Sequence, residues 1–336
     1  MIRQTAGRVF AALASLWTVL WIIVAAQPAA AQDPLPSWNN GASKQAIVAF
    51  VGRVTKAGTP DFVPVPQRIA TFDNDGTLWV EQPVYAQFAF AIDRVKLQAA
   101  AHPEWKNTEP FASLIDGNVE NLAAGGEEAL VQVLAATHAG MTTESFDRIA
   151  REWLKTKRDA RFKRPYSTLV YQPMLELLNY LRANDFKTFI VSGGGVEFMR
   201  AYAEDAYGIP PEQVIGSSGR LKYQLRGDVP ELLKLPAVDV VNDKDGKVVS
   251  IQKIIGRRPI AAFGNSDGDL QMLEWTAAGK GARLALLVHH DDAAREWSYD
   301  RGSKIGALDK ALDAAAAKKW VVVSMKDDWN TILPKQ

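Results

Sequence analysis

Three short apolar segments, each followed directly by a polar turn that contains glycine, constrain the fold of this chain more than any other feature. The apolar segments are Arg68–Phe72, Lys187–Val191 and Pro259–Phe263, and the turns are Asp73–Thr77, Ser192–Gly195 and Gly264–Asp269. Segments with the apolar spacing of helices separate them, and an order of strand, helix and strand predicts a parallel sheet with helices on both faces. Ligands bind at the carboxyl ends of the strands in such sheets, so we expect the three turns to meet there.

One long stretch interrupts this alternation. The residues between Glu81 and Ser167 show helical spacing almost throughout and little strand character. We therefore predict an α/β fold with a doubly wound parallel sheet, formed by residues 32–81 and 168–336, and an inserted helical cap over residues 82–167. Three further elements are expected: a helix over Val196–Tyr207, a small hairpin over Gln213–Gly227 and a helix over Ile305–Lys318.

The N-terminal segment has the pattern of a secretory signal peptide. Two arginines lie within the first eight residues, and no charged residue occurs from Val9 to Ala26. Pro28 then ends the apolar run, and Ala29 and Ala31 provide the small residues that signal peptidase requires. We predict cleavage after residue 31 and a periplasmic or secreted protein without stable membrane association. The alternative is an uncleaved membrane anchor, because the apolar run is just long enough to span a bilayer.

The composition excludes several classes of function. Lys and Arg number 39 and Asp and Glu 38, so the formal net charge is +1, and no basic surplus indicates a nucleic-acid partner. The chain has no cysteine, which excludes disulfides, thiolate metal sites and a cysteine nucleophile. Nothing in the sequence indicates the oligomeric state.

The turn after the first apolar segment carries two carboxylates. Asp73 and Asp75 follow a strand that is expected to be buried, and burying a carboxylate is costly unless it is paired or metal-bound. Two carboxylates close together also repel each other, which raises the pKa of one of them. A divalent cation relieves this conflict, and oxygen ligands of this kind suit Mg²⁺.

The run Phe72-Asp73-Asn74-Asp75-Gly76-Thr77-Leu78 resembles the first motif of the haloacid dehalogenase-like phosphatases. The layout, with a helical segment between the first and second motifs, is similar to the phosphoserine phosphatase-like branch of that superfamily. The resemblance implies a Mg²⁺-dependent phosphomonoesterase that acts on small phosphorylated metabolites. Asp73 would be the nucleophile that forms an aspartyl-phosphate. Asp75 would protonate the leaving oxygen and then activate water.

The second and third motifs of the resemblance supply groups that bind phosphate. Ser192 and Gly193 follow the second strand, and a hydroxyl with adjacent N–H groups before a helix forms an anion site. A lysine should then hold a phosphate oxygen. We assign this role to Lys247, which opens the helix before the third strand, with Lys253 as the alternative.

The turn Gly264–Asp269, followed by Met272 and Leu273, resembles the fourth motif. The superfamily usually has an aspartate where this chain has Asn265, so the ligand there would be an uncharged amide oxygen. The metal ligands that the resemblance implies are Asp73, Asp75 through its backbone oxygen, Asn265 and Asp269. Asp267 is a possible replacement for Asn265, and Asp269 could also orient the lysine.

Four other residues near these motifs are assigned more weakly. Glu81 could line the substrate pocket, whereas Trp79 is expected to pack in the core, and His289 and His290 are expected to be loop residues outside the site. The alternatives for the function are an exported phosphocholine-type or nonspecific acid phosphatase, a non-catalytic phosphate-binding protein, and a phosphotransferase of the same superfamily.

Overall fold

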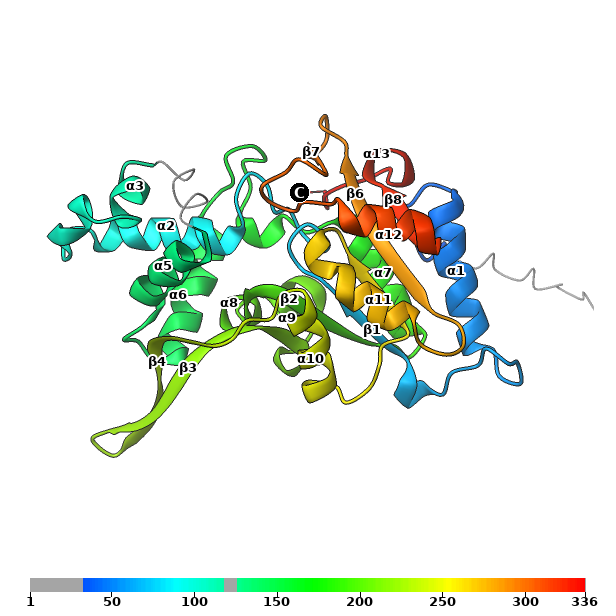
Figure 1. Cartoon of the computed structure of the whole chain (residues 1–336), viewed down its shortest axis with the longest axis horizontal. Helices are drawn as coiled ribbons and strands as arrows, with labels where there is room; N and C mark the ends of the chain where they lie inside the picture. Colours follow the sequence, from blue (N-terminus) through cyan, green and yellow to red (C-terminus); the bar gives the residue numbers. More distant parts are fainter. Residues whose placement is uncertain (1–32, 118–125, 336) are drawn as a thin grey trace, which may run out of the picture. The chain divides into compact units, whose positions relative to one another are not determined.

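A mostly parallel sheet forms the centre of the structure (Figure 1). The computed structural model describes residues 33–117 and 126–335, and the elements named below all belong to the unit Pro34–Gln336. The strands are β1 (Ile69–Phe72), β2 (Lys187–Gly195), β3 (Val214–Arg226), β4 (Val229–Val240), β5 (Ala261–Gly264), β6 (Leu284–Asp291), β7 (Ser298–Tyr299) and β8 (Val321–Ser324). Within these residues they form one sheet of eight strands in the order β4-β3-β2-β1-β5-β6-β7, with β8 paired to β6.

The pairing of the strands confirms the predicted fold class. The pairs β1–β2, β1–β5, β2–β3, β5–β6 and β6–β8 are parallel, whereas β3–β4 and β6–β7 are antiparallel. The central strands β1 and β5 are buried at every residue, as expected for a parallel sheet that is covered on both faces. Phe72 lies beside Phe263 in register, and their rings stack with centroids 4.3 Å apart.

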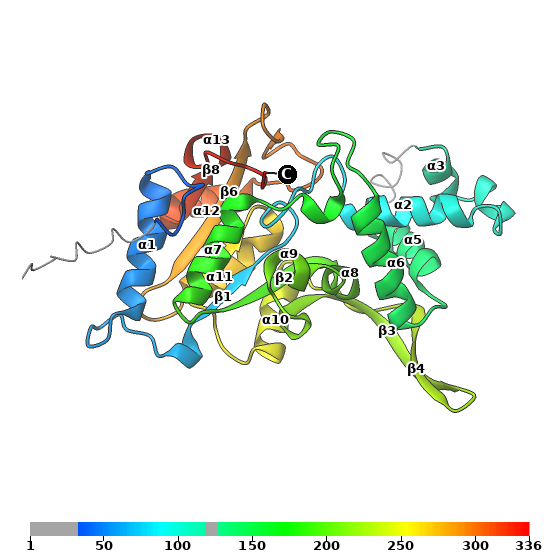
Figure 2. The same cartoon turned by 180° about the vertical axis from the view of Figure 1, so that it is seen from behind.

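Helices cover both faces of the sheet, as Figures 1 and 2 show from opposite sides. Successive residues of β5 point to opposite faces, so Phe263 joins one hydrophobic cluster and Ala262 joins another. The first cluster includes residues of α1 (Ala42–Thr55), α7 (Gln172–Ala183), α8 (Val196–Arg200) and α9 (Ala203–Tyr207). The second includes residues of α10 (Asp245–Ile254), α11 (Leu270–Ala277) and α12 (Lys310–Lys318), and α13 (Met325–Asp328) follows β8.

The chain between β1 and β2 is helical, as the sequence predicts. Its helices are α2 (Ala86–Gln98), α3 (Phe111–Ile115), α5 (Gly126–His138) and α6 (Thr143–Thr156). α2, α3 and α5 share a hydrophobic cluster of their own that includes Val95, Phe111 and Val133. The boundaries given above for the core and the cap stay a prediction, and residues 1–31 lie outside the described residues.

Short 3₁₀ turns complete the structure at Val65–Gln67, Pro103–Asn107, Tyr166–Thr168, Pro211–Gln213 and Asp267–Asp269. None of the helices in residues 33–117 and 126–335 combines the length and the hydrophobicity that crossing a membrane requires.

The predicted hairpin over Gln213–Gly227 is wrong in its extent. Gly227 and Asp228 form a two-residue turn between β3 and β4, so the hairpin is about twice as long as expected. Pro230 and Pro236 lie within β4, and proline within a segment normally argues against a strand. These two prolines explain why the sequence pattern does not predict β4.

Two predicted helices also differ from the structure. The helix over Val196–Tyr207 is interrupted near Tyr202, whose buried ring stacks on Trp79 with centroids 4.4 Å apart. The helix predicted from Ile305 begins only at Lys310. Gly306 has a positive φ of 66°, which is not helical, and the carboxylate of Asp267 accepts the N–H groups of Asp309 and Ala311 at the start of α12.

Candidate active site

The predicted site residues gather at the carboxyl ends of three adjacent strands. Asp73 follows β1, Ser192 lies within β2 and Asn265 follows β5, and the order of the sheet places these strands side by side. Asp73, Asp75, Ser192, Gly193 and Lys247 line one cavity of about 800 Å³. Asn265 and Asp269 are buried and do not line this cavity.

Lys247 connects the first and fourth motifs. Its Nζ donates to Oδ1 of Asp73 at 2.8 Å and to Oδ1 of Asp269 at 2.6 Å, and all three side chains are buried. Burial acts to lower the pKa of Lys247, but the carboxylates of Asp269 and Asp73 raise it above its usual value, so the side chain stays charged. The alternative, Lys253, is exposed on α10.

One ammonium group cannot neutralise two carboxylates. Burial and the neighbouring charge of Asp269 raise the pKa of Asp73 to about 7, although Lys247 acts in the opposite direction. The other oxygen of Asp269 accepts the backbone N–H groups of Asn265 at 3.0 Å and Ser266 at 3.1 Å. Asp269 is therefore held against Lys247 and the backbone, unlike the open metal ligand that the sequence predicts.

The second carboxylate of the first motif has different surroundings. Trp79 Nε1 donates to Oδ1 of Asp75 at 2.8 Å, so Trp79 is a core residue that also orients Asp75. Burial raises the pKa of Asp75 above its usual value. No lysine or arginine in the described residues forms an ion pair with Asp75, so the site contains more carboxylates than cations.

The glycine loop after β2 passes close to these carboxylates. A Cβ on Gly194 would lie 3.5 Å from Oδ2 of Asp75 and 3.5 Å from Oγ of Ser192. The Ser192 hydroxyl accepts the N–H of Gly194 at 3.1 Å, and the N–H of Gly195 donates to Gln87 at 2.7 Å. The loop therefore places Ser192 and Gly193 in the wall of the cavity, and their binding of phosphate stays a prediction.

Asn265 occupies the position at which an aspartate is usual. Its Oδ1 accepts a hydrogen bond from Thr77 at 2.9 Å, and its Nδ2 donates to Oε1 of Glu81 at 2.7 Å. Both polar atoms are thus engaged by protein groups, so Asn265 is not arranged as an open metal ligand. Asp267 does not replace it, because its carboxylate faces the start of α12.

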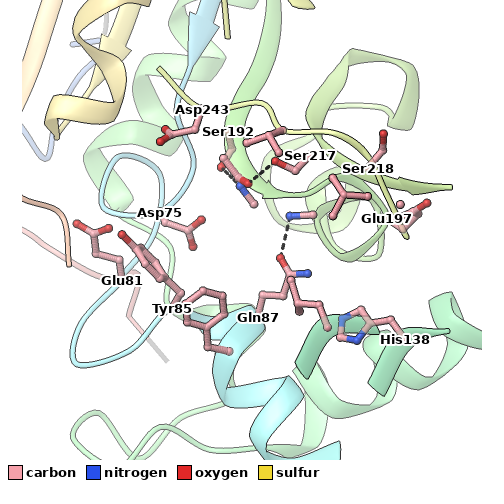
Figure 3. A pocket seen from close by; sticks show the side chains of 18 of the residues that line it. Asp75, Glu81, Tyr85, Gln87, His138, Ser192, Glu197, Ser217, Ser218 and Asp243 are labelled. Carbon is pink, nitrogen blue, oxygen red and sulfur yellow. Dashed lines mark hydrogen bonds between the residues drawn. The ribbon is translucent and has the colours of Figure 1, made fainter. Parts of the chain in front are cut away.

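Glu81 brings a further carboxylate to the edge of the cavity. It is buried, lines the cavity, and also accepts a hydrogen bond from the hydroxyl of Tyr299 at 2.8 Å. Burial raises the pKa of Glu81 well above its usual value. Figure 3 shows Glu81 beside Asp75. Glu81 closely follows the first motif in the sequence, and this position predicted that it could line the pocket.

Three residues differ from the expectations drawn from the sequence, which missed Asp243 and assigned His289 and His290 to a loop. Asp243 lines the cavity, and a Cβ on Gly193 would lie 3.6 Å from its carboxylate, but no motif includes it. His289 and His290 lie within β6, and His290 is buried. His290 Nε2 donates to the backbone oxygen of Gly76 at 2.7 Å and so supports the turn that carries Asp73 and Asp75.

The donors at this edge of the cavity fit a divalent cation only in part. Asp73 and Asp75 supply carboxylate oxygens, which a hard cation such as Mg²⁺ prefers, and the excess of buried negative charge favours a cation. Within the described residues, however, no three His, Cys, Asp or Glu side chains are arranged to hold a metal ion together. Asp73 and Asp75 line the cavity, whereas Asn265 and Asp269 do not, and the four metal ligands stay a prediction.

Comparison with known families agrees with these motifs. A model described as haloacid dehalogenase-like hydrolase matches residues 70–274, which include β1, the helical segment and the turn after β5. The chain belongs to the haloacid dehalogenase-like hydrolase family. This result confirms the superfamily that the first motif predicts, and the family is described as one of hydrolases. A search of curated proteins found no match.

Solved structures resemble this family member at low sequence identity, and the first of the three below shares its fold. A conserved functionally unknown protein from Anaerococcus prevotii DSM 20548 is 17% identical, covers 84% of this chain and 91% of its own, and has a TM-score of 0.54. A protein with unknown function from Bordetella pertussis Tohama I is 13% identical, covers 77% and 99%, and has a TM-score of 0.49. A phosphoserine phosphohydrolase-like protein from Francisella tularensis subsp. tularensis SCHU S4 is 17% identical, covers 74% and 98%, and has a TM-score of 0.40.

Lys247 should stabilise this hydrolase in the absence of metal. The substitution Lys247→Met leaves Asp73 and Asp269 buried without a cation, and we expect the free energy of unfolding to fall by about 3–5 kcal/mol at pH 7.5. Urea unfolding of metal-free protein measures this change. The exposed Lys253→Met should change it by less than about 0.5 kcal/mol. Equal effects of the two substitutions would contradict the assignment of Lys247.

The raised pKa of Asp73 predicts a pH dependence of stability in metal-free protein. Between about pH 4 and about pH 7 folded Asp73 retains a proton that the unfolded chain has released, so its contribution to the free energy of unfolding falls as the pH rises. Asp73→Asn removes this contribution. The Asp73 contribution lowers the urea midpoint of the original chain between pH 5 and pH 7.5. The midpoint of the Asp73→Asn variant should therefore fall by less over the same pH range. An identical pH dependence would show that Asp73 is not the titrating group.

Proposed function

We propose that this hydrolase is a Mg²⁺-dependent phosphomonoesterase that acts through an aspartyl-phosphate at Asp73, as in the phosphoserine phosphatase-like branch of its family. One observation carries the proposal: Asp73 and Asp75 face the same buried cavity as Ser192, and Lys247 bonds directly to Asp73. The cavity thus brings together a candidate nucleophile, a candidate proton donor and candidate phosphate-binding groups.

In the first step a carboxylate oxygen of Asp73 attacks phosphorus and the bond from phosphorus to the ester oxygen breaks. Asp75 gives its proton to that leaving oxygen, and the product alcohol departs. The burial that raises the pKa of Asp75 favours its protonated form, which suits a general acid. The Trp79 indole donates to Oδ1 of Asp75 and so orients the carboxyl group that exchanges the proton.

In the second step Asp75, now a carboxylate, takes a proton from water. The water oxygen attacks phosphorus, the acyl–phosphate bond breaks, and Asp73 and inorganic phosphate are released. Lys247 and the Ser192–Gly193 loop bind the phosphoryl oxygens throughout, and Asp269 keeps Lys247 in place. The carboxylate of Asp73 and the backbone oxygen of Asp75 would hold Mg²⁺, which would supply positive charge that offsets the developing charge on the phosphoryl group.

The substitution Asp73→Asn tests this route. We expect it to lower kcat for p-nitrophenyl phosphate by about three orders of magnitude or more with the fold retained, because an amide cannot act as the nucleophile. EDTA should abolish the activity of the original chain, and added Mg²⁺ should restore it. Asp228→Asn, at the exposed tip of the hairpin, serves as the control with full activity. An active Asp73→Asn variant, or activity that persists in EDTA, would contradict the proposal.

We also propose that the protein is exported and cleaved after residue 31. Its charged N-terminal segment, uncharged apolar run and small residues before Gln32 support this. We expect the protein purified from the periplasm of an expressing bacterium to begin at Gln32, as determined by mass spectrometry of the intact chain. An intact N-terminus with the protein in the membrane fraction would instead favour an uncleaved anchor.

A further inference from the structure

A second cavity lies at the amino ends of the strands, at the edge of the sheet opposite the active site. Its volume is about 510 Å³, which is within the range of small-molecule sites. Residues from three loops line it: 60–67 before β1, 257–260 before β5 and 280–283 before β6. Because β1, β5 and β6 are parallel, the three loops share one edge of the sheet, and Asp73, which follows β1, lies at the other.

The lining of this second cavity, called the basic cavity below, carries a surplus of positive charge. Four cationic side chains line it: Arg257, Arg258, Lys280 and Arg283. Among the described residues Asp61 is the only acidic one in the lining, and its Oδ2 lies 3.9 Å from Nε of Arg53, a cation outside the basic cavity. No carboxylate in residues 33–117 and 126–335 forms an ion pair with any of the four cations. The fold thus brings together charges that it does not neutralise.

The four cations are accessible to a ligand. Arg257 and Lys280 are exposed, and Arg258 and Arg283 are half-buried. The guanidinium of Arg258 lies over the ring of Trp275, 3.5 Å from its centroid. Stacking uses the face of a guanidinium, whereas its N–H groups lie in its plane, so the donors of Arg258 remain available to an acceptor.

Arg283 is held near Arg258 although both are positively charged. Gly279 makes room for it, since a Cβ there would overlap Nε of Arg283 and lie 2.9 Å from its Nη2. Within the described part of the chain, the one hydrogen bond of this guanidinium runs from Nη1 to the backbone oxygen of Ala282 at 3.1 Å. Burial, and after it the charge of Arg258, lower the pKa of Arg283 below its usual value. An anion that contacts both side chains would relieve this repulsion.

The rest of the wall of the basic cavity is largely apolar. Phe62, Val63 and Pro64 contribute to it from the loop before β1. The buried Arg68 donates from Nε to the backbone oxygen of Val63 at 2.9 Å, and its guanidinium lies 5.6 Å from the centroid of the Phe62 ring. These contacts fix the loop against the start of β1, so the fold itself shapes this wall.

We propose that the basic cavity binds a chain of two or more linked phosphate groups, either inorganic or attached to a nucleoside, separately from the catalytic site. Its cations come from two loops, two of them before β5 and two before β6. Phosphate groups are tetrahedral and present oxygens on several sides, so two linked groups can accept hydrogen bonds from both loops at once. Guanidinium groups also pair with phosphate through two parallel hydrogen bonds. A single carboxylate is planar and carries one charge, and would leave most of the surplus unpaired.

Calorimetric titration of metal-free protein with pyrophosphate tests this inference and needs no turnover, so its result does not depend on the proposed phosphatase function. We expect Arg257→Gln and Arg283→Gln each to weaken binding about tenfold, and the two together about a hundredfold, because each removes charge-assisted hydrogen bonds. Lys280→Gln is a second exposed position with the same expected effect as Arg257→Gln. Arg148→Gln, on an exposed arginine of α6 that lines neither cavity, is the matched control and should leave the affinity unchanged.

Two further ligands identify the chemistry that is recognised. Citrate carries several charges but no phosphate, and we expect it to bind at least about tenfold more weakly than pyrophosphate. ADP separates the two sources of linked phosphates. Tighter binding of ADP than of pyrophosphate, weakened by Phe62→Ala, supports a nucleoside against the apolar wall, whereas equal or weaker binding of ADP supports an inorganic phosphate chain.

Absence of pyrophosphate binding, citrate binding as tight as that of pyrophosphate, or an equal loss in Arg148→Gln would overturn the inference. Ser192→Ala, at the active site, should leave the affinity unchanged. Binding that Ser192→Ala abolishes and the arginine variants retain would place pyrophosphate at the active site and also refute the inference. Arg257→Gln should hydrolyse p-nitrophenyl phosphate at the rate of the original chain, and failure of both proteins to hydrolyse it would contradict the proposed function alone.

Discussion

The shared ion pair of Lys247 is the interaction on which the arrangement of the site depends. A single ammonium on α10 bonds to Asp73 after β1 and to Asp269 after β5, and all three groups are buried. Three segments that are far apart in the chain therefore meet at one point. Because one positive charge faces two carboxylates, the pKa of Asp73 rises, and the site as a whole favours an additional cation or a proton.

A second set of contacts holds the turn that carries the two aspartates. Gly76 has a positive φ of 74°, and a Cβ at this position would overlap Asn265 and Glu81. His290 donates to the backbone oxygen of Gly76, and Asn265 links Thr77 to Glu81. The amide in place of the usual aspartate therefore has a structural use in this chain. It accepts from Thr77 and donates to Glu81, and an aspartate at this position would have no N–H group to donate.

The cavity of the active site has two kinds of wall. Asp73 and Asp75 lie at the rim of the parallel sheet, whereas Leu134 and Leu235 belong to α5 and to the β3–β4 hairpin. Gly140 and Met141, just after α5, form backbone hydrogen bonds with Lys234 of β4, so these outer walls are joined to each other. The outer walls therefore belong to other elements than the two aspartates and can vary without disturbing them.

The sequence by itself predicted the class of fold and the family, which are confirmed, and it named candidate site residues that the fold brings to one cavity. Short apolar strands ending in polar turns can be recognised locally, and the rule that parallel strands present their carboxyl ends at one edge brings those turns together. Asp73, Asp75, Ser192, Gly193 and Lys247 were found in this way. Lys247 was separated from Lys253 by its place at the start of the helix, and the structure places only Lys247 at the cavity.

Only the tertiary structure decided how the remaining polar groups are used. Asn265, Asp267 and Asp269 look alike as members of one acidic turn, but they bond respectively to Glu81, to the start of α12 and to Lys247. These partners lie between 22 and 184 residues away along the chain, so no local pattern identifies them. A buried polar group bonds to whichever segments the fold brings next to it. Its partners therefore depend on the packing of the whole chain and not on the local sequence.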